Sequence, residues 1–293
     1  MSAEELEAWF MDNPWVVAYI TILFIGSLAS LIFLIVQITK TKQISEQPVS
    51  SWKIQDLDFA IFVTAVVFWF VISGYAIFRL LGMFSEPGAD LGTGAIVAGG
   101  LVLHGGMLAI FLIFRQMNRN PNEGPINPRI IPLGKSMALG LFYFLASLPI
   151  VYGVGLVWGG FLELLRRFGY EVDLPLQDAV ILIQETESAV GFLGLILLAV
   201  VVAPIVEESV FRGGIYRYCK GKTSIFVSLL ISGLVFGLIH FNIQSLPGLI
   251  TVGVCLGLAY ELSGSLRVSI FFHAFFNLNS ILWILIIPDA LVT

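Results

Sequence analysis

The chain has 293 residues, of which 58% are hydrophobic and only 12% are charged. Its mean hydropathy of +0.94 is far above that of a water-soluble domain of this length. The net charge of −5, without a basic stripe interleaved with aromatic residues, argues against a nucleic-acid partner. We therefore expect a multi-pass integral membrane protein, in the plasma or inner membrane if its source is bacterial.

Eight stretches of the sequence are long and apolar enough to cross a bilayer as helices, since a spanning helix needs about 20 apolar residues. They are uniformly apolar rather than alternating, which distinguishes them from barrel strands. The sequence thus predicts an all-α fold, a polytopic transmembrane helical bundle of about eight spans. These spans lie near residues 15–38, 57–82, 94–114, 137–161, 190–211, 224–241, 246–262 and 268–287.

Two loops organise these spans. A segment rich in proline and asparagine, 117–132, is typical of a linker and separates three spans from five. It predicts two units: 1–136, with three N-terminal helices and a cytoplasmic linker, and 137–293, a catalytic helical bundle. Lysine and arginine concentrate in alternate loops, which favours both termini outside. The acidic segment 163–188 is expected at the membrane surface, as an ordinary loop helix or as a lid.

Charged side chains at the end of the fifth span are the first candidates for a functional site, because charges within a span are costly. Glu208 and Arg212 are four residues apart and can pair on a helix, whereas Glu207 is rotated about 100° away and stays available. Pro204 lacks a backbone N–H, so we expect a kink one turn before the carboxylates. The simpler interpretation is that these charges only mark the cytoplasmic end of the helix.

Two histidines follow in similarly apolar surroundings. His240 ends an apolar run, and Phe236, one turn earlier, is placed to pack against its ring. His273 and Asn277 are four residues apart, so they project from one face of a helix. A basic turn lies about midway between Glu207 and His240, so a helical hairpin brings these two side chains to similar depth.

Two further expectations concern the histidines. His104, in the glycine-rich third span, is expected to be an ordinary core residue, as a lone histidine on an apolar helix usually is. His273 lies only six residues beyond Arg267, so straight full-length helices would leave it about 18 Å from His240 in depth. A single site therefore requires a tilt, a stagger or a hairpin that projects beyond the bilayer.

The cluster favours hydrolysis of an amide or ester bond. Glu207 with His240 would form a general base that takes a proton from water. His273 and Asn277 offer N–H groups for the oxyanion of a tetrahedral intermediate. Zinc is the alternative, because two histidines and one glutamate can hold a catalytic zinc ion, which makes Glu207, His240 and His273 candidate metal ligands. The sequence leaves open whether the cofactor is absent or is a divalent metal such as zinc.

The motifs Glu207-Glu208-x-x-x-Arg212-Gly213, Phe236-x-x-x-His240 and His273-x-x-x-Asn277, in this order, resemble those of the CPBP family. These are the CAAX-protease and bacteriocin-processing membrane proteins, also called Abi. The resemblance covers roughly 193–287 and leaves the first three spans outside. It implies an all-helical bundle with an active site open to the cytoplasm, in which the Glu207 and His240 pair activates water. His273 and Asn277 would stabilise the oxyanion, with Glu208, Arg212 and Phe236 in support.

Three classes of function fit these features. The favoured one is an intramembrane endopeptidase that acts on a membrane-associated peptide or protein. A non-catalytic immunity or scaffold protein that binds a membrane partner is the second. A transporter is the third, because buried carboxylates and histidines also serve as proton relays.

Overall fold

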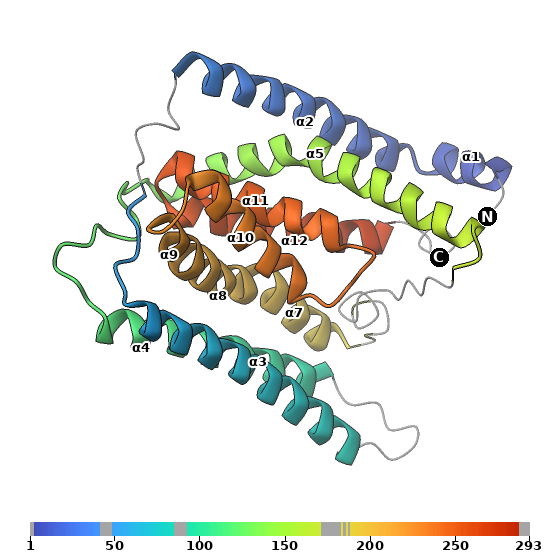
Figure 1. Cartoon of the computed structure of the whole chain (residues 1–293). Helices are drawn as coiled ribbons and strands as arrows, with labels where there is room; N and C mark the ends of the chain where they lie inside the picture. The colour runs from blue at the N-terminus through green and yellow to red at the C-terminus, as the bar shows by residue number, and fades with distance from the viewer. Residues whose placement is uncertain are drawn as a thin grey trace.

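The computed structural model is a bundle of membrane-length helices (Figure 1) and describes residues 3–41, 49–84, 93–170, 183, 186 and 188–286. Within these ranges there is no strand, and seven helical segments are long and apolar enough to cross a membrane. Apolar helices are stable in lipid because each satisfies its own backbone hydrogen bonds. The predicted all-α, polytopic membrane fold is confirmed.

The helices begin and end close to the predicted spans. In chain order they are α1 (Ala3–Asp12), α2 (Pro14–Thr41), α3 (Asp56–Phe84), α4 (Thr93–Met117), α5 (Leu133–Arg167), α7 (Ala189–Leu197), η2 (Leu198–Val202), α8 (Ala203–Val210), η3 (Phe211–Tyr216), α9 (Arg217–Lys220), α10 (Ile225–Leu238), α11 (Leu246–Ser263) and α12 (Leu266–Ile286). The segments from α7 to α9 join into one span, Ala189–Lys220.

The helices form three groups in space. Figure 1 shows α2 and α5 along one side of the bundle, α3 and α4 along the opposite side, and α7 to α12 between them. Helix α5 packs on α2, α11 and α12, while α4 packs on α3, α7 and α8. The C-terminal helices are therefore enclosed by the N-terminal ones. The proposed boundary between 136 and 137 remains a prediction.

Two helices differ in length from the predicted spans. Helix α5 continues to Arg167, beyond the predicted end at 161, so Glu163 belongs to this helix and pairs with Arg167 (Oε1–Nε 3.1 Å) instead of starting a surface segment. Most of the rest of that predicted segment lies outside the described residues. Helix α10 has only 14 residues, a rise of about 21 Å, which is short of the roughly 30 Å hydrocarbon core.

Glycines of α10 and α11 make a close backbone contact between these two helices. A Cβ atom placed on Gly253 would lie 2.7 Å from the Cα of Gly233, so neither helix has room for a side chain. This contact sets the distance between the two helices, and with it the position of Phe236, one turn beyond Gly233.

Replacing Gly253 with alanine is expected to lower the free energy of unfolding by about 1–3 kcal/mol, because two backbones must separate to admit the methyl group. Unfolding in detergent micelles measures this loss. Gly248→Ala is the matched control on the same helix, since nothing lies within 4 Å of the added Cβ. Equal stability of the two variants would contradict the packing argument.

The loops that connect the N-terminal helices form hydrogen bonds with the C-terminal helices. Buried Arg217 donates to the carbonyl of Ser50 (2.7 Å) and to the carboxylate of Glu123 (2.8 Å), which lie in the connections after α2 and α4. The amide of Leu266 donates to the side chain of Asn127 (2.7 Å). The predicted linker is thus attached to the C-terminal helices by specific hydrogen bonds.

Candidate active site

A change of helical register precedes the two glutamates. In the π-helical turn η2, the N–H of Ala203 donates to Leu198, five residues earlier. The same pattern would pair the carbonyl of Ala199 with residue 204, but Pro204 has no N–H. The side chain of Asn277 fills this gap by donating to the Ala199 carbonyl (2.8 Å). The helix is distorted next to Pro204, as expected from the sequence. The hydrogen bond from Asn277 also holds helix α12 against this turn, immediately before the two glutamates.

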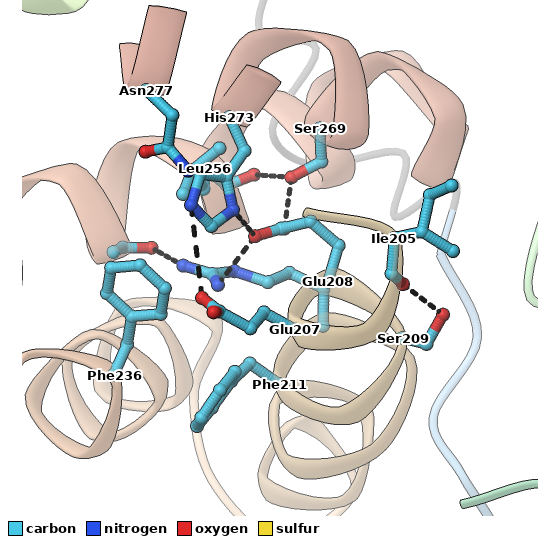
Figure 2. A network of polar contacts seen from close by, with 12 residues as sticks. Ile205, Glu207, Glu208, Ser209, Phe211, Phe236, Leu256, Ser269, His273 and Asn277 are labelled. Atoms are coloured by element: carbon cyan, nitrogen blue, oxygen red, sulfur yellow. Dashed lines mark hydrogen bonds and ion pairs between the residues drawn. The ribbon is translucent and has the colours of Figure 1, made fainter. Parts of the chain in front are cut away.

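Glu208 is the centre of a buried polar network (Figure 2). One of its oxygens accepts hydrogen bonds from Arg212 Nη1 (2.9 Å) and His273 Nδ1 (3.1 Å). The other oxygen accepts a hydrogen bond from Ser269 Oγ (2.5 Å). Arg212 also donates to the carbonyl of Gly253 (2.6 Å). The i,i+4 ion pair predicted from the sequence is confirmed, and it joins α8 to α11 and α12.

Glu207 points to a different side of the helix and lies between two histidines. Its Oε1 is 3.6 Å from His104 Nε2, and its Oε2 is 3.9 Å from His273 Nε2. Oε2 is buried and makes no hydrogen bond within the described part of the chain. About 13% of the side chain is exposed, whereas Glu208 is fully enclosed. Glu207 is therefore the less enclosed of the two carboxylates and has an oxygen without a hydrogen-bond partner.

Phe236 connects the other two motifs. Its ring packs on His240, as predicted, with centroids 4.9 Å apart, and it also contacts the ring of His273 edge-on at 5.5 Å. His240 Nδ1 donates to the Phe236 carbonyl (2.7 Å), because a carbonyl can only accept. His240 lies within electrostatic range of Glu207, although the closest polar partners of that carboxylate are His104 and His273.

His104 is the residue that the sequence misplaced. It was expected to be an ordinary core side chain, but α4 brings it to Glu207, where it makes an ion-pair contact. The signal in the sequence was a histidine inside a glycine-rich span, in which Gly100 allows α4 to approach Leu198 closely. Hydropathy alone does not say which helix α4 will face.

The predicted difference in depth between His240 and His273 is removed because the two helical hairpins that carry them are staggered along the bundle axis. Glu208 lies opposite Ser269, three residues into α12, yet the chain runs on for twelve more residues to the end of α9. The turn between α9 and α10 therefore projects beyond the turn between α11 and α12. The short α10 then ends near the level of His273, and Phe236 touches both histidine rings.

The metal-ligand hypothesis finds less geometric support. Among the described residues, no three His, Cys, Asp or Glu side chains are arranged to hold a metal ion. This includes the predicted set of Glu207, His240 and His273. His240 and His273 do share a feature of many metal-binding histidines, because the Nδ1 atom of each is bound to an oxygen acceptor.

Comparison with known proteins finds similarity in the C-terminal part of the chain. Residues 189–279 match the family model described as type II CAAX prenyl endopeptidase Rce1-like. That range contains all of the site residues predicted from the sequence. The C-terminal segment is therefore similar to proteins of the CPBP family. Helices α1 to α5, and His104 with them, lie outside the matched CPBP segment.

Two curated bacterial proteins are similar to part of this chain. The putative membrane peptidase YdiL of Bacillus subtilis is 31% identical over 83 residues, which are 28% of this chain and 34% of the relative. The membrane-embedded CAAX protease MroQ of Staphylococcus aureus is 30% identical over 97 residues, or 31% and 39% of the two chains. The matches thus span between a third and two fifths of each relative. No solved structure matches.

Proposed function

We propose that the protein is an intramembrane endopeptidase in which Glu207 activates water to hydrolyse a peptide bond of a membrane-associated protein or peptide. The observation that supports this most directly is the buried Glu207 Oε2, which has no hydrogen bond and lies beside His273. An unbonded carboxylate oxygen within a membrane domain is costly unless the site uses it. The protease names of the family and of both relatives agree with this chemistry.

In the proposed reaction, Glu207 takes a proton from water, helped by His240, while the hydroxide attacks the carbonyl carbon of the peptide. The C–N bond then breaks, and the leaving amine receives the proton. His273 stabilises the oxyanion through Nε2–H when its ring is protonated, since its Nδ1–H is already bound to Glu208. The amide hydrogen of Asn277 that is not bound to Ala199 provides the second donor.

Peptide termini provide the test. Membranes from cells that make the wild-type protein are compared with membranes that contain Glu207→Gln at equal abundance, with and without a metal chelator. New termini found only with the wild type are the expected result and would identify substrates. Identical termini in both membranes would contradict the peptidase and favour a binding or immunity role. Loss of the termini with the chelator would assign the activation of water to a metal ion.

Replacing Asn277 with alanine is expected to have two effects. Loss of an oxyanion donor lowers kcat by about 10²- to 10³-fold. Loss of the Asn277 hydrogen bond to the Ala199 carbonyl, which Pro204 cannot replace, lowers the free energy of unfolding by about 1–3 kcal/mol. Initial cleavage rates and melting in micelles measure the two effects separately.

Asn279→Ala is the matched control for this change. Asn279 lies two residues further along α12, is also largely buried, and forms hydrogen bonds with Tyr19 (2.8 Å) and Tyr152 (3.3 Å). We expect this variant to be destabilised while its kcat stays normal. If Asn277→Ala behaved in the same way, Asn277 would be a structural residue only.

A further inference from the structure

Helix α4 runs alongside the span that carries the glutamates, and glycines allow the close approach. A Cβ atom placed on Gly191 would lie 2.6 Å from Thr93, and one on Gly100 would lie 2.3 Å from Leu198. Further along, Phe111 packs on Gly213. Because these contacts advance in the same direction on both helices, the helices are parallel. His104 therefore falls level with the turn that carries Glu207.

The ring of His104 is held in one orientation. Its Nδ1 lies 2.8 Å from the carbonyl of Gly100, one turn earlier on α4. A carbonyl can only accept, so Nδ1 carries a hydrogen and Nε2 is left to face Glu207 Oε1 at 3.6 Å. Both side chains are about 13% exposed, so water screens this contact only weakly.

The two facing atoms require a proton between them. With Nδ1 protonated, a neutral His104 would present a lone pair at Nε2 to a carboxylate oxygen, and two acceptors repel each other. An imidazolium at His104 next to an ionised Glu207 removes the repulsion and forms an ion pair. The same arrangement leaves Oε2, on the side of His273, without a hydrogen bond.

We propose that His104 is a positioning residue of the active site: as an imidazolium it binds Glu207 through Oε1, so that Oε2 is presented to the attacking water. The inference rests on the proposed peptidase function. It means that α4, which lies outside the CPBP segment, contributes a side chain to the site. A CPBP segment without such a helix would have to orient its glutamate by other means.

Two substitutions of His104 separate its charge from its hydrogen bond. His104→Leu removes both, and we expect kcat to fall about 100-fold, as a misplaced catalytic group commonly causes. His104→Gln keeps an N–H donor without the charge, and we expect a partial rescue to a loss of about 10-fold. KM should change little in either variant, because His104 acts on Glu207 and not on the substrate. Gly105→Ala is the control, since nothing lies within 4 Å of its added Cβ.

Three outcomes of this experiment are informative. Loss of kcat at constant KM in His104→Leu, with partial rescue by His104→Gln, would support the inference. Normal kcat in His104→Leu, while Glu207→Gln is inactive, would overturn it and leave the peptidase proposal intact. Cleavage that Glu207→Gln does not reduce would overturn the peptidase proposal itself. A double-mutant cycle on the melting temperature, with His104→Gln and Glu207→Gln, tests the contact independently of activity, and additive shifts would contradict it.

Discussion

Glu207→Gln is expected to reduce kcat by about 10²- to 10⁴-fold, the contribution typical of a general base. Glutamine has the same shape but cannot take a proton from water. Because glutamine cannot form the ion pair with His104, the loss of kcat is measured on folded protein at matched concentration. Single-turnover cleavage of a substrate identified from the new peptide termini, by protein purified in micelles, measures the loss.

Glu261→Gln is the control that makes this result specific. Glu261 is also a buried carboxylate, but it lies near the C-terminal end of α11, where it binds Lys220 (2.5 Å) and Tyr216 (2.7 Å). We expect the control to be destabilised and to keep a normal kcat. Cleavage by Glu207→Gln at the wild-type rate would remove Glu207 from the role of base.

Glu208→Ala should be the most destabilising of these substitutions, with a loss of about 3–5 kcal/mol in the free energy of unfolding. The change leaves the guanidinium of Arg212 buried without its carboxylate, and it also removes the acceptor for His273 and Ser269. Melting in micelles and the amount of protein in the membrane fraction report the effect.

The matched control for Glu208→Ala is the charge-neutral Glu208→Gln, which keeps the volume and one acceptor oxygen. We expect a smaller loss of stability than for Glu208→Ala, because no cavity forms and some hydrogen bonds survive. A loss below about 1 kcal/mol in Glu208→Ala would mean that Arg212 finds another partner, and that the network is not needed to hold α8 against α12.

Much of the fold could be read from the sequence, for a physical reason. Lipid requires each spanning segment to satisfy its own backbone, so length and hydropathy locate spans such as α3 and α11 to within a few residues. Ion pairing between Glu208 and Arg212 follows from helical spacing alone. Both are local properties of the chain and need no knowledge of neighbouring helices.

The remaining features depend on contacts between distant segments. The position of His104 is set by glycines of α4 and α7 and by the side chains that fill the space they leave, which hydropathy does not record. The link from Asn277 to Ala199 arises only because a π-helical turn shifts the register before Pro204. Likewise, the shortness of α10 and the stagger of its hairpin depend on packing. The sequence therefore predicted different depths for His240 and His273 and could not show how the two meet.

The glycine contacts of α4 also limit how this protein can be recombined with its relatives. Gly191 receives Thr93 from α4, while Gly100 of α4 receives Leu198, so each helix is recessed where the other protrudes. A chimera that grafts these N-terminal helices onto the matching segment of a relative must transfer both residues of each contacting pair. Otherwise two side chains would occupy the space that a glycine now leaves free. The grafted N-terminal helices would then be unable to pack closely against the C-terminal ones.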